Sequence, residues 1–135
     1  MLRINTKLIM TLSAITLGAI GVALTFCPVE VSVWIGLGSA INFQVILQLL
    51  GGLYFGFAML NWMSKGSIIG GIYNKPISIA NFAHYFIGAM ALIKALLRNQ
   101  NLPGYLWIAA SVYAIFALCF WIIFSRSPVA ETTAQ

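Results

Sequence analysis

The chain has 135 residues, of which 61% are hydrophobic and 7% are charged, and its formal net charge is +5. A soluble domain is roughly 45–50% apolar and about 25% charged, so this composition excludes an ordinary soluble fold and predicts a membrane protein. The seven basic residues stand near the ends of apolar runs instead of forming a basic patch. We therefore expect a lipid bilayer as partner, and no nucleic acid.

Four apolar runs are long enough to cross a bilayer, which takes about 20 helical residues. They cover residues 8–27, 41–60, 77–97 and 103–124. We predict an all-α fold, a four-helix transmembrane bundle with a short interfacial segment between its first two spans. The bundle is expected to form a single domain over residues 1–126, followed by a small, polar and flexible tail over residues 127–135.

The first apolar run follows a short basic segment, as the apolar core of a signal peptide does. It could therefore be either a cleaved signal peptide or the first transmembrane helix. The run from Leu8 to Phe26 is longer than the ~7–15 residues of a signal-peptide core, and no small-x-small cleavage site follows it. We therefore expect an uncleaved first span.

The basic residues also predict the orientation of the spans. An even number of spans puts both termini on one side, and Lys and Arg favour the cytoplasmic side. A cytoplasmic N-terminus gives five basic residues inside and two outside. The inner set is Arg3, Lys7, Lys65, Lys75 and Arg126, and the outer set is Lys94 and Arg98. We expect Lys94 to snorkel toward the outer interface, with a pairing to Gln44 as the alternative.

The connection after the first span is too short and too rich in glycine to cross the bilayer. Pro28 ends the first span, and residues 28–41 predict a short segment in the outer interface with Trp34 at headgroup level. We expect a helix there, although the alternation of apolar residues over 29–35 also fits a strand.

The connection between the second and third spans, residues 61–76, combines glycines with three isoleucines. We expect it to lie on the inner leaflet or dip into it. Lys65 and Lys75 could contact an anionic headgroup or a partner there, or they could only set the topology.

The second span carries an unusual line of residues at successive i+4 positions, namely Gln44, Gln48, Gly52 and Gly56. A helix stacks them on one face, which favours contact with other helices over contact with lipid. The glutamines could form interhelical hydrogen bonds, line a polar pathway or bind a headgroup. The two glycines predict helix packing, either within the chain or between subunits.

The third span contains His84, the chain's one histidine. Asn81, His84 and Gly88 share a face by i+3/i+4 spacing. Packing this face on the second span would bring Tyr54 beside His84 and define a candidate intramembrane polar cluster of Gln44, Gln48, Tyr54, Asn81 and His84. An imidazole there could relay protons or gate by pH, or it could stay neutral and tie helices together. Gly18 and Gly88 complete the predicted packing glycines.

Missing residue types narrow the chemistry. The chain has no Asp, and its two acids, Glu30 and Glu131, lie outside the spans. An acid–base pair, a Ser-His-Asp triad and a carboxylate metal site are therefore not expected within one chain. Cys27 and Cys119 show no CxxC spacing and are predicted to lie in opposite leaflets, which excludes a disulfide between them. We expect no catalytic residues, no cofactor and no metal.

A few residues also carry a family resemblance. Phe26-x-Pro28, with Gly36 downstream, closes the first span, and the second contains Gly51-Gly52-Leu53-Tyr54-x-Gly56-x-Ala58. With these features the layout resembles the small four-helix membrane proteins grouped as DoxX-like, which include many uncharacterised bacterial members. The resemblance implies a bacterial inner membrane and roles that range from oxidoreductase subunits to assembly factors. It brings no catalytic signature.

These observations predict a non-enzymatic accessory or assembly partner in a membrane complex, with a homo-oligomer as one form of such a complex. The alternative is a small oligomeric transporter or channel with a polar pathway along the second and third spans. A lipid-modifying or quinone-linked enzyme subunit ranks below both, because no catalytic set is visible.

Overall fold

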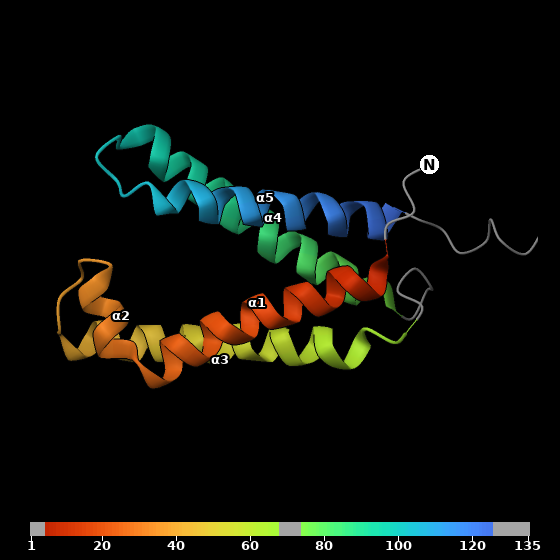
Figure 1. Cartoon of the computed structure of the whole chain (residues 1–135), viewed down its shortest axis with the longest axis horizontal. Coiled ribbons are helices and arrows are strands. Elements are labelled where there is room, and N and C mark those ends of the chain that lie inside the picture. Colours follow the sequence, from red (N-terminus) through yellow and green to blue (C-terminus); the bar gives the residue numbers. More distant parts are fainter. Residues whose placement is uncertain (1–4, 68–73, 126–135) are drawn as a thin grey trace, which may run out of the picture. The chain divides into compact units, whose positions relative to one another are not determined.

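The structure, a computed structural model, describes residues 5–67 and 74–125, and these two ranges contain five helices and no strand. The helices are α1 (Thr6–Phe26), α2 (Pro28–Trp34), α3 (Ile41–Ser64), α4 (Lys75–Arg98) and α5 (Tyr105–Ser125) (Figure 1). All except the short α2 are long and apolar enough to cross a membrane. The prediction of an all-α fold with four spanning helices is confirmed, and the predicted tail over residues 127–135 lies outside the described residues.

The chain divides into two compact units. One is formed by residues 10–65 and contains most of α1, all of α2 and all of α3. The other is formed by residues 1–9 and 66–135 and contains α4 and α5. The predicted single domain over residues 1–126 would join the two units, as would the predicted packing of the second span on the third. Both stay predictions.

Within the first unit, α1 and α3 run antiparallel and pack through glycines (Figure 1). A Cβ atom added to Gly21 would lie 2.8 Å from the backbone nitrogen of Phe55 and 2.9 Å from the carbonyl oxygen of Gly51. A Cβ added to Gly51 would lie 2.9 Å from the backbone nitrogen of Thr25. The two backbones therefore approach so closely at Gly21 and Gly51 that a larger residue would force them apart.

The segment after α1 is a helix, so the strand alternative is wrong. The backbone N–H of Cys27 donates to Ala23 at 2.9 Å at the end of α1, and Pro28 opens α2, where its missing N–H is tolerated. Gly36 and Gly38, with φ of 82° and 78°, follow α2 in a left-handed conformation that glycine adopts without strain. The Ser32 hydroxyl donates to the carbonyl of Gly38 and holds this turn.

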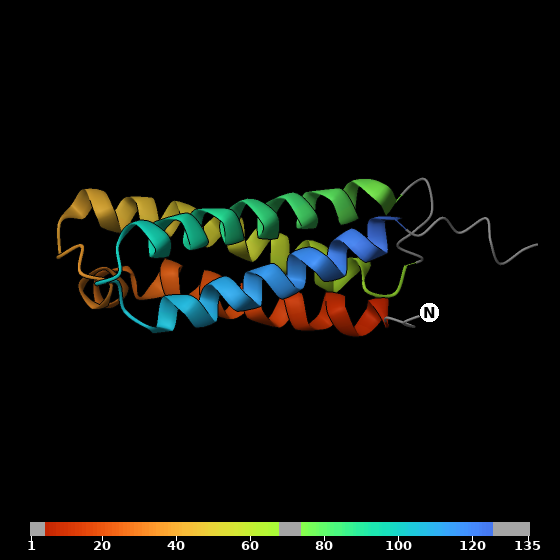
Figure 2. The same cartoon turned by 90° about the horizontal axis from the view of Figure 1, so that it is seen from above.

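In the second unit, α4 and α5 form an antiparallel hairpin, which Figure 2 shows from a second side. Its core is aromatic. The fully buried ring of Tyr85 stacks on Phe116 at 4.8 Å and on Phe120 at 5.8 Å between centroids. Phe82, three residues before Tyr85 on α4, lies 5.2 Å between ring centroids from Trp121 on α5. These offset and tilted ring pairs are the arrangements that aromatic side chains favour.

Seven of the eight ends of the spanning helices differ by one to four residues from the predicted boundaries, and three of these differences have a clear physical reason. α3 continues to Ser64 instead of ending near residue 60, because the polar Asn61 is buried in a helix contact and does not begin a loop. α4 begins at Lys75, before Pro76, since a proline in the first turn costs no backbone hydrogen bond. α5 begins at Tyr105, so Pro103 precedes the helix and its carbonyl accepts from the N–H of Leu106 at 3.1 Å.

Candidate functional site

The two glutamines predicted to lie on one face of α3 make different contacts. Gln44 is half-buried, and its Nε2 donates to the carbonyl of Ser39 at 2.8 Å, just before the helix. Gln48 is exposed, and its Nε2 lies 3.5 Å from the carbonyl of Thr25 on α1, a long hydrogen bond. Tyr54, half-buried, lies further along α3. The amide of Gln44 therefore hydrogen-bonds to the backbone just before α3, whereas the amide of Gln48 is directed toward α1.

The polar residues predicted on α4 lie in the unit that contains α4 and α5, residues 1–9 and 66–135, called the hairpin unit below. Asn81 is fully buried, and its Nδ2 donates to the carbonyl of Ile77 at 2.9 Å, one turn earlier. His84 is half-buried, with its ring edge-on to Tyr85 at 5.2 Å and tilted to Tyr113 at 5.7 Å between centroids. Since Gln44, Gln48 and Tyr54 belong to the other unit, the predicted five-residue cluster stays a prediction.

The predicted packing glycines have unequal surroundings. A Cβ at Gly88 would lie 2.5 Å from two ring atoms of Tyr113, so this glycine makes room for that ring. A Cβ at Gly18 would meet the Cβ of Ala58 at 3.6 Å, an ordinary contact. Within residues 10–65, a Cβ built at Gly52 or Gly56 would meet nothing within 4 Å beyond the neighbouring backbone of α3 itself. The tight contact between α1 and α3 is instead made by Gly21 and Gly51.

Sequence reasoning missed a buried polar pair in the same contact. Asn61 Nδ2 donates to the hydroxyl oxygen of Ser13 at 2.8 Å, and both residues are fully buried. The sequence predicts Asn61 in the inner connection, because it closes the apolar run. The signal that could have found the pair is the spacing of Leu47, Gly51, Ala58 and Asn61, which places them together on the buried face of α3.

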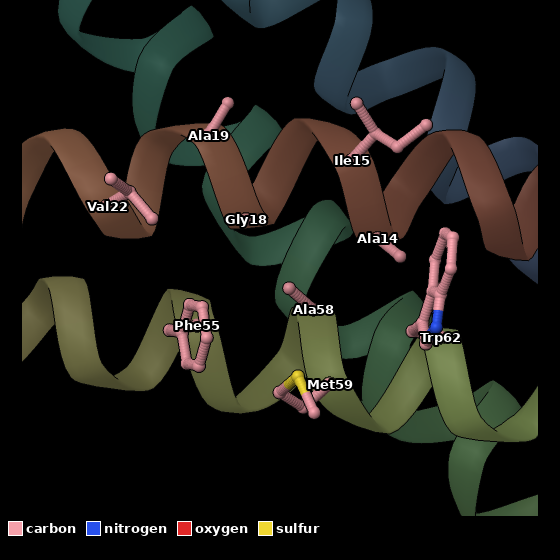
Figure 3. A pocket seen from close by; sticks show the side chains of 9 residues that line it. All are labelled: Ala14, Ile15, Gly18, Ala19, Val22, Phe55, Ala58, Met59 and Trp62. Carbon is pink, nitrogen blue, oxygen red and sulfur yellow. The ribbon is translucent and has the colours of Figure 1, made fainter.

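An apolar groove of about 270 Å³ runs beside this contact (Figure 3). Its base is made of the small residues Ala14, Gly18 and Ala58, and Trp62 reaches from α3 toward α1 beside Ala14. Its other lining residues are Ile15, Ala19, Val22, Phe55 and Met59. The groove can accommodate a hydrocarbon chain, but it has no side chain that could act as an acid, a base or a nucleophile.

The two lysines of the inner connection lie at helix ends. Lys65 follows α3 directly, and its Nζ is 2.9 Å from the centroid of the Trp62 ring, a cation–π contact. Lys75 is the exposed first residue of α4. The expected dip of this connection into the leaflet concerns mainly residues 68–73, which lie outside the described residues. Headgroup or partner contact at the two lysines stays a prediction.

In residues 5–67 and 74–125, no group of three or more His, Cys, Asp or Glu side chains is close enough to hold a metal ion. Cys27 and Cys119 are free thiols. The arrangement of the described residues supports helix packing and contact with lipid.

Four apolar helices and a composition with few charges define a multi-pass integral membrane protein. No protein-family model, curated protein or solved structure matches the chain. The resemblance to DoxX-like proteins therefore stays a prediction.

Proposed function

We propose that the chain is a non-enzymatic accessory or assembly subunit of a larger membrane complex. In this proposal it resides in a bacterial inner membrane with both termini in the cytoplasm, as the DoxX-like resemblance and the distribution of basic residues favour.

The observation that supports this proposal most directly is the face of α3 that carries Gln48, Gly52 and Gly56. Within residues 10–65 this face has open space beside both glycines, and the large residues that flank it, Leu49 and Leu53, are 69% and 65% exposed. Glycines four residues apart let a second helix approach closely in a membrane. The face therefore has the form of a docking surface for a helix.

The side-chain amide of Gln48 also favours a partner helix on this face. A side-chain amide offers two donors and an acceptor with two lone pairs, and Gln48 makes one long hydrogen bond, to the carbonyl of Thr25. An amide exposed to hydrocarbon without partners is unfavourable, so a polar group from a partner helix would stabilise it. A helix that uses the two glycines for close approach would bring such a group within reach.

The alternative, a small oligomeric transporter or channel, requires the polar side chains of α3 and α4 to line a pathway. Gln44 and Asn81 each donate to a nearby backbone carbonyl, at 2.8 and 2.9 Å, and these bonds favour a structural role for the two amides. The discriminating measurement is solute flux in liposomes. The accessory role predicts no flux, and a flux that His84→Ala changes would support the transporter.

The docking proposal can be tested by photocrosslinking in the source membrane. A photoreactive amino acid in place of Leu53, beside the glycine pair, is expected to give an adduct of higher mass. The matched control is the same amino acid in place of Ile115 on α5, which is 61% exposed. The Gly52→Leu/Gly56→Leu double variant is expected to lose the complex in native mass spectrometry. A lone monomer from gently solubilised membranes, with no adduct at Leu53, would contradict the proposal.

A further inference from the structure

Two basic side chains, Lys94 and Arg98, lie in the last two turns of α4. Lys94 and Arg98 are four residues apart, so they project from one face of the helix, and both are exposed. The described residues contain a single acidic side chain, Glu30, which lies on α2 in the other unit. The hairpin unit's described residues therefore offer no carboxylate to either cation.

The two cations line an open groove of about 590 Å³ at the closed end of the α4–α5 hairpin. Ala91 and Ala95, the small exposed residues one turn earlier on α4, form its apolar floor, and Leu102 from the connection completes it. On α4, Ala91 and Ala95 form one row at i, i+4 spacing, and Lys94 and Arg98 form a neighbouring row, so the groove has an apolar side and a basic side. A phospholipid likewise combines a charged phosphate with apolar acyl chains, so one molecule could use both sides of the groove.

Asn99 adds a neutral donor at the basic end of the groove. Its backbone N–H donates to the carbonyl of Ala95 at 3.0 Å, and its side-chain Oδ1 accepts from the backbone N–H of Asn101 at 3.1 Å. The second bond orients the side chain, and the Nδ2 group remains as a donor beside the two cations. An anion in the groove would meet three side chains that donate hydrogen bonds and none that repels it.

The position of the groove along the helix matches the level of lipid phosphates. The 24 residues of α4 extend for about 36 Å, which exceeds the hydrocarbon thickness of about 30 Å. The last turns of α4 therefore reach the headgroup region. The first turn of α5, next to the same connection, carries Tyr105 and Trp107, and Trp107 is 50% exposed, as expected of an aromatic side chain at the membrane interface.

We infer that this groove is a binding site for one anionic phospholipid, with its phosphate held by Lys94, Arg98 and Asn99 and an acyl chain over Ala91 and Ala95. In this site, the Lys94 side chain that is predicted to snorkel would contact the phosphate of the bound lipid. The inference does not depend on the proposed accessory role, because it concerns the hairpin unit and not the glycine face of α3.

The test is native mass spectrometry of the full-length protein in detergent, titrated with phosphatidylglycerol or with phosphatidylcholine. Wild type is expected to retain phosphatidylglycerol in preference to phosphatidylcholine. Each cation near an anionic headgroup contributes roughly fivefold in affinity, so Lys94→Gln/Arg98→Gln is expected to weaken phosphatidylglycerol binding about 25-fold. The charge-preserving variant Lys94→Arg/Arg98→Lys is expected to bind as wild type does.

A second variant separates a shaped site from general attraction between charges. Ala91→Leu/Ala95→Leu keeps both cations but fills the apolar floor, and it is expected to lose the bound lipid while retaining wild-type thermal unfolding. Excess glycerol phosphate, which has the headgroup chemistry without acyl chains, is expected to leave the lipid bound. Three results would overturn the inference. They are equal retention of both lipids by the wild type, unchanged binding in both the neutralised and the filled variants, and full displacement of the lipid by glycerol phosphate.

Discussion

Gly51 and Gly52 are neighbours in the sequence, but within residues 10–65 only Gly51 lies against another helix. Successive residues of an α-helix point about 100° apart, so one of two adjacent glycines can serve a tight contact while the other faces away. Gly51 meets the backbone of α1 at Gly21 and Thr25, whereas Gly52 has open space beside it in this unit. On α3, the close approach to α1 therefore requires a glycine at position 51 and not at position 52.

We predict that Gly51→Ala lowers the free energy of unfolding by about 1–3 kcal/mol, the usual cost of overpacking a close contact. The added Cβ would lie 2.9 Å from backbone atoms of Gly21 and Thr25, which cannot rotate away. The control is Gly52→Ala, whose Cβ would meet nothing of residues 10–65 within 4 Å beyond the neighbouring backbone of α3, and which removes a residue unfavourable in helices. Reversible unfolding in mixed micelles measures both, and equal values for the two variants would contradict the assignment.

We also predict a measurable coupling between Ser13 and Asn61. Their hydrogen bond of 2.8 Å is fully buried, and such bonds between membrane helices contribute about 0.6–1.7 kcal/mol. A double-mutant cycle of Ser13→Ala and Asn61→Ala is expected to give a coupling in this range. Thr16→Val is the comparison, because the Thr16 hydroxyl donates within α1, to Leu12 at 2.9 Å. A cycle of Thr16→Val with Asn61→Ala should show no coupling.

The glycines show what the sequence could and could not predict at this scale. The i+4 spacing of Gln44, Gln48, Gly52 and Gly56 correctly places them on one helical face, but spacing alone does not identify the face that meets α1. The buried face, with Leu47 and Gly51, is offset from it by one residue. That choice is set by complementary small residues on α1, which a pattern within one helix does not contain.

At the scale of elements, the α4–α5 hairpin is held by aromatic rings around one glycine. Tyr113 is buried between the backbone at Gly88 and the edge of Tyr85, with 5.2 Å between the two ring centroids. The sequence predicted both helices from their apolar length but not this pairing. Aromatic residues occur throughout both helices, and only the register of the hairpin decides which rings meet.

We predict that Gly88→Ala destabilises the hairpin by about 1–3 kcal/mol, because its Cβ would overlap the Tyr113 ring, which Tyr85 and His84 confine. The matched test is the same change in a Tyr113→Ala background. There the ring is gone, and Gly88→Ala is expected to cost little. Unfolding in micelles gives the free energies, and near-UV circular dichroism reports the packing of the rings. An equal cost in both backgrounds would show that the ring is not what Gly88 accommodates.

At the scale of the whole molecule, apolar length and few charges were sufficient to predict four spanning helices. The ends of the helices are less predictable, because a polar residue after an apolar run can either end a helix or continue it. Asn61 and Ser64 are polar yet helical, since Asn61 has a buried partner and Ser64 ends the last turn. The predicted packing of the second span on the third stays a prediction, because a pattern within one helix does not specify its partner helix.

The predicted orientation can be tested with the chain's own cysteines. Cys27 is exposed at the junction of α1 and α2, whereas Cys119 is half-buried within α5. Since five of the seven basic residues favour cytoplasmic termini, Cys27 is expected to face the outside. A membrane-impermeant maleimide should therefore label spheroplasts at Cys27, and Cys27→Ser should abolish the signal.

The control places a thiol at the opposite end of α3. Ser67 is exposed, so Ser67→Cys in a Cys27→Ser/Cys119→Ser background should react once the membrane is permeabilised and not before. Helix α3, with 24 residues, is long enough to separate Cys27 from Ser67 by a full bilayer, so the two sites should give opposite results. Labelling of Cys27 in inside-out vesicles alone would reverse the orientation. Labelling of both sites from one side would mean that α3 does not cross the membrane.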